Sequence, residues 1–370
     1  YNINKLKNII IFNTKKILKK HKIKKIIPIT HGSASFFLNE DKKYLSGPHF
    51  LQDSSKSFDR AFFHNVKKND YTHSIKFDCY HNLGKSFYYL LKNLKKLKIK
   101  KIFTFPSLVN YILTDKLYLD KSYLACHSYV WNFKKKKMIN FFLKYKRFFP
   151  QILSSGKSIG YLKKEYFNKR KVKVLNGIHD TSGSYLAFNK NQESKNSLII
   201  NTGTYFIISK KIKFIYSLKK DFYCNYGANN NLYLCKRLNA GLIFQKFNPK
   251  MLFQKKKLSL SKASSFYKKN NKKNIDKLKI INKSSQINDF LKLNYYIAKK
   301  LSKQISNFTN NSDKYKIFID GNFVKNEIFI YFLKRLVKCK IFINNNSFIN
   351  CLGASTFFNK KNINLQYKRT

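Results

Sequence analysis

The sequence predicts an α/β protein with two domains, and three observations support this. The chain of 370 residues is longer than one hydrophobic core usually accommodates. Its residues are 43% hydrophobic and 16% aromatic, which is too apolar for a disordered chain in spite of the high charge. Residues 289–353 alternate between segments with helical spacing and short apolar segments, as α/β domains do.

The first half is predicted to contain helices separated by short strands. Residues 5–20 are predicted as a helix, and residues 23–30 as a strand that ends at His31-Gly32. Ligands of open sheets usually lie beyond the carboxyl ends of the strands, so His31 is a candidate site residue. The other expected elements are a strand that begins at 36–38, an irregular polar stretch at 47–80, and helices at 83–97, at 106–113 and ending near 148.

The domain boundary is predicted between Phe188 and Ser197, where the eight residues NKNQESKN are all polar or charged. This gives domains of residues 1–189 and 190–370. The region 255–277, rich in Lys, Ser and Asn, is predicted as a surface insertion. The second domain is expected to hold a hairpin at 198–209, strands at 222–226, 232–235, 315–320 and 339–343, and helices at 289–308, 326–337 and after Gly353.

The segment 175–209 organises the prediction of function. A strand is expected to run into Gly177, with Asp180 at the start of a helix, and the following hairpin turns at Thr202-Gly203-Thr204. An acid at a helix start suits proton abstraction from a hydroxyl, and a hydroxyl-and-glycine turn suits holding a phosphate by backbone N–H groups. Each motif alone is more often a helix cap or a hairpin turn. Their adjacency predicts phosphoryl transfer.

The chain is strongly basic, with a formal net charge of +59 from 76 Lys and Arg against 17 Asp and Glu. Such a charge ordinarily indicates nucleic acid or an anionic membrane surface as partner. Here nearly all of it is Lys spread along the chain, whereas nucleic-acid readers favour clustered Arg. The joint abundance of Lys, Asn, Ile, Phe and Tyr is typical of an AT-rich coding sequence. Nucleic acid is therefore expected to bind only nonspecifically, with a steep dependence on salt.

Cysteines and apolar runs predict a cytoplasmic protein. The six cysteines show no CxxC pair and no zinc spacing, and reduced thiols are the expected state. No apolar run is long enough to cross a bilayer, so no membrane association is predicted. The chain begins with Tyr1 rather than Met, which favours an N-terminally incomplete piece.

The chain carries a series of motifs in this order: ITHGSAS at Ile29, NLGKSFYYL at Asn82, ACHSYVWN at Ala125, NGIHDTSGSYL at Asn176, INTGTYFI at Ile200, NAGLIF at Asn239, DGNFVKN at Asp320 and LGAS at Leu352. This ordered set resembles the FGGY carbohydrate kinases of the actin/hexokinase/Hsp70-like superfamily. The resemblance extends from about residue 15 to about residue 358. The motifs ITHG, CHSYVW and GIHD are similar to those of the branch that acts on ketoses such as fuculose, rhamnulose or xylulose.

The resemblance implies two RNase H-like domains that face each other over a cleft, with the sugar deep inside and ATP with Mg²⁺ at the mouth. Asp180 would be the general base, and the turn at 202–204 would cradle the transferring phosphate. The resemblance also places Gly241, Gly321 and Asn326 along the nucleotide, and His31, His127 and Trp131 near the sugar. A sugar and ATP are thus the expected partners, and a homodimer is one open oligomeric state.

Simpler roles stay open for the same residues. The two histidines are often satisfied interior or surface residues, and Trp131 is equally suited to core packing. Asn326 is also suited to capping the next helix, and Gly321 to a sharp turn. A noncatalytic, polyanion-binding kinase remnant is the alternative function. A nicotinamide-dependent enzyme is disfavoured because no GxGxxG motif opens a helix after a strand.

Two departures from the family pattern bear on activity. Nothing before His31 matches the first phosphate hairpin, Asp-x-Gly-Thr, whose Asp helps to position the metal in the family. Either the first domain is N-terminally truncated or the kinase is catalytically impaired. At Gly321-Asn322 the family usually has two glycines, but Asn tolerates the left-handed conformation better than most residues.

Overall fold

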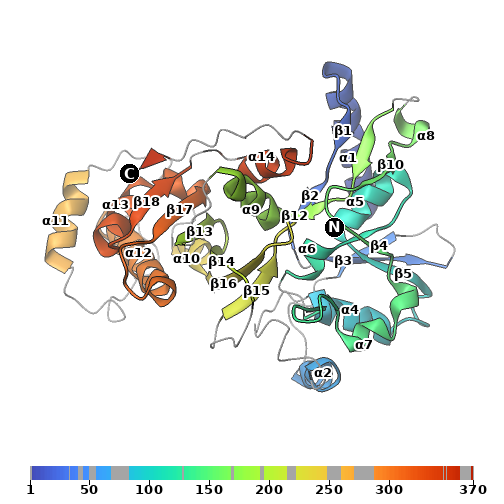
Figure 1. The fold of residues 1–370 in the computed structure, drawn as a ribbon, viewed down its shortest axis with the longest axis horizontal. Helices are drawn as coiled ribbons and strands as arrows, with labels where there is room; N and C mark the ends of the chain where they lie inside the picture. The colour runs from blue at the N-terminus through green and yellow to red at the C-terminus, as the bar shows by residue number, and fades with distance from the viewer. Residues whose placement is uncertain are drawn as a thin grey trace. The chain divides into compact units, whose positions relative to one another are not determined.

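The computed structural model describes most of the chain and supports the mixed α/β prediction (Figure 1). The contacts between residues divide the chain into two compact units. The first comprises Tyr1–Ala187, Ile212–Leu234 and Asn350–Ile363, and the second comprises Phe188–Lys211, Cys235–Ile349 and Asn364–Thr370. The described residues are 2–32, 34–40, 45–49, 56–67, 83–126, 129–167, 171–191, 196–214, 222–247, 260–270, 287–344, 346, 348–358 and 368–369.

Parallel pairing of two distant segments positions the functional part of the first unit. The predicted strand 23–30 forms two short strands, β1 (Lys25–Ile26) and β2 (Ile29–Thr30), with Pro28 between them. Proline has no backbone N–H to donate, which fits an interruption at this point. β1 pairs with β11 (Lys173–Leu175) and β2 pairs with β12 (Ile178–His179), both in parallel. Residues 31–32 and 179–180 therefore leave the same edge side by side.

Helix α1 (Ile3–Lys20) covers this region through its apolar side. Leu18 joins a buried cluster with Leu113 and Val174, and Ile10 and Ile11 pack against the same cluster. The helix starts at Asn2, whose side chain accepts a hydrogen bond from the Lys5 backbone N–H. Helical spacing of apolar residues therefore predicted this helix correctly.

The remaining elements of the first unit are short. β4 (Leu45–His49), β3 (Ser35–Asn39) and β5 (Ile99–Thr104) form an antiparallel sheet in that order. The rest are α2 (Lys56–Phe62), the π-helix Phe63–Lys67, α4 (Leu83–Lys92), α5 (Phe105–Thr114), β6 (Leu119–Asp120), α6 (Lys121–Leu124), β7 (Trp131–Asn132), β8 (Lys137–Met138), α7 (Asn140–Leu143), the 3₁₀ helix Lys146–Phe148, β9 (Ile152–Leu153), β10 (Ser158–Tyr161), α8 (Lys164–Phe167), β15 (Phe222–Tyr226), α9 (Asp180–Asn191) and α14 (Ile349–Ser355).

The largest sheet has seven strands in the order β15-β16-β14-β13-β17-β18-β19. Its centre belongs to the second unit and combines an antiparallel hairpin with two parallel neighbours. The hairpin is β13 (Ser197–Thr202) with β14 (Phe206–Ile212), and β13 pairs in parallel with β17 (Lys316–Gly321). The remaining elements are β16 (Leu232–Leu238), α10 (Ala240–Phe247), α11 (Leu260–Asn270), α12 (Ile287–Thr309), the 3₁₀ helix Asn322–Lys325, α13 (Glu327–Leu336), β18 (Lys340–Ile343) and β19 (Lys368–Arg369).

Several expected elements were wrong in detail. The stretch 47–80, expected to be irregular, holds helical residues at 56–67. Residues 255–277, predicted as a surface insertion, contain the helix α11, which was not predicted. The expected helix ending near 148 is divided into two short helical turns, α7 and the 3₁₀ helix Lys146–Phe148. No helix in the described ranges combines the length and apolarity that crossing a membrane requires.

Two glycines allow α9 and α14 to approach within backbone contact. Gly353, expected to precede the last helix, lies inside α14. A Cβ at this position would lie 1.7 Å from the carbonyl oxygen of Gly183 in α9, and a Cβ on Gly183 would lie 2.4 Å from the carbonyl oxygen of Asn350. Both glycines are therefore required by close packing of two helices rather than by turns.

We expect Gly353→Ala to destabilise the protein, although alanine is the better helix former. Helix propensity alone would add up to about 1 kcal/mol of stability. The backbone clash should outweigh this and lower the free energy of unfolding by more than about 2 kcal/mol. Urea unfolding followed by circular dichroism measures the sign of the change in the free energy of unfolding. A variant more stable than wild type would contradict the close contact.

Candidate active site

Asp180 is the first residue of α9 and lies next to the short strand β12. Its side chain is 39% exposed. Three contacts converge on one carboxylate oxygen, Oδ1: the Thr181 backbone N at 2.6 Å, Thr181 Oγ1 at 3.2 Å and His179 Nε2 at 3.3 Å. Among the described residues, no hydrogen bond reaches Oδ2. One oxygen is thus held by the protein, and the other is available to a ligand.

His179 is the buried neighbour of Asp180 and is only 4% exposed. Its Nε2 lies 3.5 Å from Cys126 Sγ, and its ring stacks edge-on against Tyr123. Burial lowers the pKa of His179 below its usual value, and the nearby Asp180 carboxylate opposes this effect. The imidazole is therefore neutral at physiological pH.

Gly32 supplies space for the His179 ring. A Cβ on Gly32 would lie 2.7 Å from His179 Nε2, closer than a Cβ atom comes to other heavy atoms in proteins. The glycine follows β2, and His179 ends β12, so the parallel pairing of these strands brings them together. His31 precedes this glycine, is exposed, and lies edge-on to Phe105 with ring centroids 5.1 Å apart.

Trp131 lies in β7 and is 4% exposed. Its indole Nε1 is buried and has no hydrogen-bond partner among the described residues, and the Lys121 ammonium lies 5.7 Å from its ring centroid. The burial of Trp131 agrees with a role in core packing. Its indole N–H without a described acceptor calls for a further explanation, and a ligand is one such explanation. His127, the third residue predicted near the sugar, lies outside the described residues.

The predicted phosphate turn lies in the second unit, between β13 and β14. Thr202 is buried, and its hydroxyl donates a hydrogen bond to the carbonyl oxygen of Asp320 at 2.5 Å. Gly203 and Thr204 are exposed at the tip. A Cβ on Gly203 would meet nothing closer than 3.9 Å, so the tip has open space around it.

The start of α10 packs against this turn. A Cβ on Gly241 would lie 2.1 Å from the Gly203 carbonyl oxygen, and the Leu242 backbone N–H donates to the Thr204 carbonyl at 3.0 Å. The N-terminus of a helix carries partial positive charge and attracts anions. The exposed turn and the helix start together form a surface suited to phosphate.

Gly321 lies beside Thr202 because β17 pairs with β13 in register, Thr202 opposite Gly321. Its φ of 95° is in the region that side chains avoid, and a Cβ would lie 2.2 Å from the Thr202 carbonyl oxygen. Asn326 is 1% exposed and caps α13 by accepting from the Phe329 N–H, while its amide donates to Asn294 Oδ1. The geometry thus shows a structural role for both residues, and their contact with nucleotide stays a prediction.

Asp320 is a buried carboxyl group that the sequence reasoning did not select. It is 2% exposed, and its Oδ1 accepts from Asn201 Nδ2 at 2.7 Å. In the part of the chain that the structure describes, its Oδ2 has no hydrogen-bond partner. Burial raises the pKa of Asp320 to about 7, and the Asn201 hydrogen bond offsets only part of this. The signal in the sequence was the motif DGN, in which only the glycine was assigned a role.

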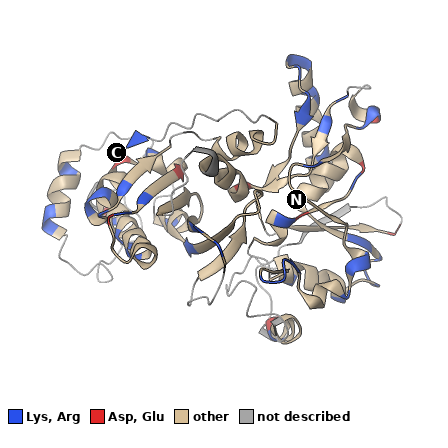
Figure 2. Cartoon of the chain, in the orientation of Figure 1, with Lys and Arg blue, Asp and Glu red and all other residues tan. Residues whose placement is uncertain are grey.

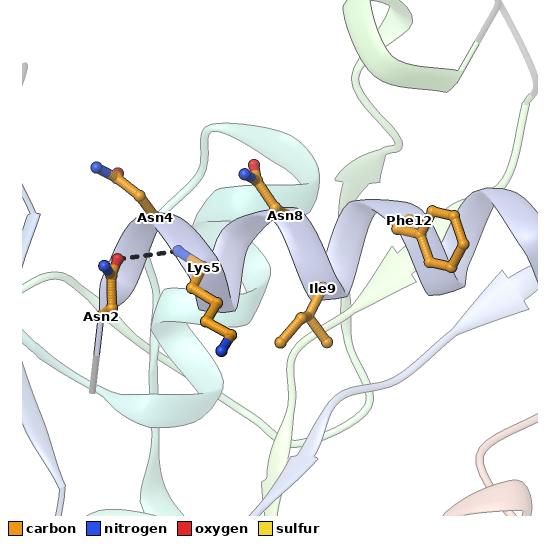
Figure 3. A pocket seen from close by; sticks show the side chains of 6 residues that line it. All are labelled: Asn2, Asn4, Lys5, Asn8, Ile9 and Phe12. Carbon is orange, nitrogen blue, oxygen red and sulfur yellow. Dashed lines mark hydrogen bonds between the residues drawn. The ribbon is translucent and has the colours of Figure 1, made fainter.

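The hollow along α1 contains none of these residues. It has a volume of about 570 Å³ and is lined by Asn2, Asn4, Lys5, Asn8, Ile9 and Phe12 (Figure 3). All six side chains come from one helix or its cap, and none carries a carboxylate, thiol or imidazole that could act as a base or nucleophile. The hollow is therefore not the candidate active site.

We expect Asp320→Asn to change how folding stability depends on pH. The folded carboxyl has a raised pKa, so its contribution to stability is full below about pH 4 and is lost as pH rises through about 7. The substitution removes this loss. Between pH 5 and pH 8 the wild type should therefore lose about 2–3 kcal/mol more than the variant. Urea unfolding at pH 5 and pH 8 measures the free energy of unfolding of both proteins. An equal change in that free energy for wild type and variant would contradict the prediction.

Comparison with known proteins gives matches in structure. No family model and no curated protein matches the sequence. A carbohydrate kinase from Novosphingobium aromaticivorans aligns with 100% of this chain and 87% of its own, with a TM-score of 0.76 and 16% identity. A ligand-bound xylulose kinase from Lactobacillus acidophilus aligns with 98% of this chain and 82% of its own, with a TM-score of 0.72 and 16% identity.

A more distant kinase gives the same result. The Plasmodium falciparum glycerol kinase, solved with ADP, aligns with 95% of this chain and 78% of its own, with a TM-score of 0.70 and 14% identity. At such identities the likeness establishes the fold alone. The structural resemblance expected from the motifs is thereby confirmed over the full chain: this protein has the fold of the FGGY carbohydrate kinases.

Proposed function

We propose that the protein phosphorylates a sugar hydroxyl with ATP. The observation that carries this proposal is the state of Asp180: one carboxylate oxygen is anchored, the other receives no hydrogen bond from a described residue, and solvent reaches the side chain. A general base needs this combination of fixed orientation and access. The fold shared with carbohydrate kinases supports a sugar as the acceptor.

In this proposal Oδ2 of Asp180 accepts the proton of the attacking hydroxyl. The hydroxyl oxygen then forms its bond to the γ-phosphorus of ATP while the bond to the β-phosphate oxygen breaks, and ADP leaves. His31, His127 and Trp131 are proposed to surround the sugar. The exposed His31 offers a polar ring, and Trp131 offers an unused buried N–H donor.

The turn at Thr202-Gly203-Thr204, with the start of α10, is proposed to hold the phosphates. Its exposed tip and the open space at Gly203 fit a phosphate that approaches the backbone. The described residues contain no cluster of three or more His, Cys, Asp or Glu side chains that could cage a metal ion. Mg²⁺ is proposed to arrive with the nucleotide, because that ion takes most of its ligands from phosphates and water and neutralises charge during transfer.

The two halves of the proposed reaction belong to different units of the chain. Asp180 lies in the first unit and the phosphate turn in the second. Phosphoryl transfer requires an in-line arrangement of hydroxyl, phosphorus and leaving group. We therefore propose that both halves act on one substrate pair, as the two RNase H-like domains and the cleft implied by the family resemblance would require. The division of these roles between residues 1–189 and 190–370 is part of the same proposal.

A ketose of the xylulose, rhamnulose or fuculose type is the proposed acceptor. The sequences of the motifs ITHG, CHSYVW and GIHD support this class, and one of the solved structures of similar fold is a xylulose kinase. ADP release from ATP·Mg²⁺ can be compared for these three ketoses against gluconate and glycerol. Turnover restricted to gluconate or glycerol would contradict the ketose class and leave the kinase assignment intact.

The alternative of a polyanion-binding remnant draws only on net charge. Lys and Arg are scattered over helices and strands of both units rather than gathered on one element (Figure 2). A scattered charge supports nonspecific attraction but no defined nucleic-acid site. The structure therefore adds no observation in favour of this alternative.

We expect Asp180→Asn to reduce ketose phosphorylation by at least about 100-fold, because the amide cannot accept the hydroxyl proton. The melting temperature should stay within a few degrees of wild type, since the side chain is partly exposed. Asp115→Asn is the matched control, because Asp115 is 59% exposed and has a left-handed backbone that Asn tolerates. Retained turnover in Asp180→Asn would remove Asp180 as the base.

We expect Gly203→Ala to weaken ATP binding by at least about tenfold without changing stability. The added methyl group meets no protein atom within 3.9 Å, so folding should change by less than about 0.5 kcal/mol. It would, however, stand where a phosphate is proposed to approach the backbone. Gly321→Ala should behave in the opposite way and destabilise the fold. Isothermal titration with ATP tests this, and unchanged affinity in Gly203→Ala would exclude the turn as the phosphate site.

A further inference from the structure

The His179 side chain fills a space that three residues on two segments of the first unit define. Cys126 Sγ lies 3.5 Å from Nε2, the Tyr123 ring lies edge-on with centroids 5.8 Å apart, and Gly32 leaves no room for a side chain of its own. The ring is 4% exposed. Its position is therefore fixed by packing rather than by contact with solvent.

The buried Nε2 lies beside the oxygen of Asp180 that the protein holds. The distance from Nε2 to Oδ1 is 3.3 Å. If Nε2 carried a lone pair, it would face a carboxylate oxygen and repel it. We therefore assign the proton to Nε2, which makes the contact attractive in the neutral ring.

His179 is unsuited to act as the base itself. Its Nε2 already contacts Cys126 and Asp180, and burial keeps the ring from solvent. Asp180 differs, because its side chain is 39% exposed and no described residue donates a hydrogen bond to its Oδ2. The two adjacent residues thus divide two tasks, with one side chain buried and fixed and the other partly exposed and able to react.

We propose that His179 is a positioning residue, with Gly32 as its support: the fixed imidazole edge holds Oδ1 of Asp180 so that Oδ2 faces the sugar hydroxyl. This rests on the proposed role of Asp180 as base. Rotation about the Asp180 side-chain bonds would otherwise exchange the two oxygens or turn both away. A small displacement of a reacting group is costly in catalysis, up to about 100-fold for about 1 Å.

The test compares His179→Leu with His179→Gln, using ATP·Mg²⁺ and whichever ketose of the xylulose, rhamnulose and fuculose set the wild type phosphorylates best. Leucine removes the N–H donor, and we expect kcat to fall about 10–100-fold with KM for both substrates changed less than about threefold. Glutamine keeps an N–H group at similar reach, and we expect it to restore kcat to within about fivefold. His21→Leu is the control, because His21 is exposed at the end of α1.

A double-mutant cycle then tests the support by Gly32. Gly32 has no positive φ, so Gly32→Ala strains nothing in its own backbone and acts by displacing the His179 ring. We expect Gly32→Ala to lower kcat in wild type and to have little further effect in His179→Leu. Additive losses would show that Gly32 acts independently of His179 and would overturn its role as support.

Nitrogen-15 NMR of histidine-labelled protein gives a readout that needs no turnover. His179→Gln identifies the His179 resonances among the eight histidines. The wild-type ring should show the Nε2–H tautomer, and Asp180→Asn should shift that nitrogen. An Nδ1–H tautomer, or no shift in Asp180→Asn, would overturn the proposal.

The two proposals fail in different ways. Loss of turnover in Asp180→Asn with normal kcat in His179→Leu overturns the positioning role and leaves the kinase base in place. Retained turnover in Asp180→Asn removes the base assignment, and with it the positioning role. A lower melting temperature of His179→Leu with unchanged kcat per folded molecule identifies a purely structural histidine and also overturns the proposal.

Discussion

Parallel pairing between strands far apart in sequence is the constraint on which both functional regions depend. In the first unit, residues 25–30 run beside residues 173–179, so that the chain leaves both strands at one edge. In the second unit, β13 runs beside β17 over six residue pairs. Adjacent parallel strands end together, and the residues just beyond them become neighbours. His31, Gly32, His179 and Asp180 meet by this means, as do Thr202 and Gly321.

The elements with regular apolar spacing could be predicted from the sequence, because the periodicity reports directly which face is buried. The helix predicted at 289–308 is observed as α12 at Ile287–Thr309, and the hairpin predicted at 198–209 is β13 with β14. Prediction failed where local composition was dominated by Lys, Asn and Ser. In α11 these polar residues occupy a helix whose buried contacts are few, Ala263 and Asn270 among them. Such a helix gives little periodic signal.

The site was predicted less completely than the fold. Asp180 and the turn at 202–204 were selected because acid, hydroxyl and glycine carry recognisable chemistry. His179 was read only as part of a motif, since adjacency in sequence does not reveal that its ring turns inward against Cys126 and Gly32. Asp320 was missed for a related reason. Its significance comes from burial and from the cross-strand contact with Asn201, which depends on residues more than a hundred positions apart.

The contact between α9 and α14 has a consequence for how the protein is made. Gly183, in the first turn of α9, packs against Gly353, and the first unit also includes residues 212–234 and 350–363. The ribosome must therefore synthesise almost the whole chain before α9 can pack against α14. Until then the first unit is left with an uncovered face of α9, and a chain cut short before residue 350 would keep that face exposed to chaperones or proteases.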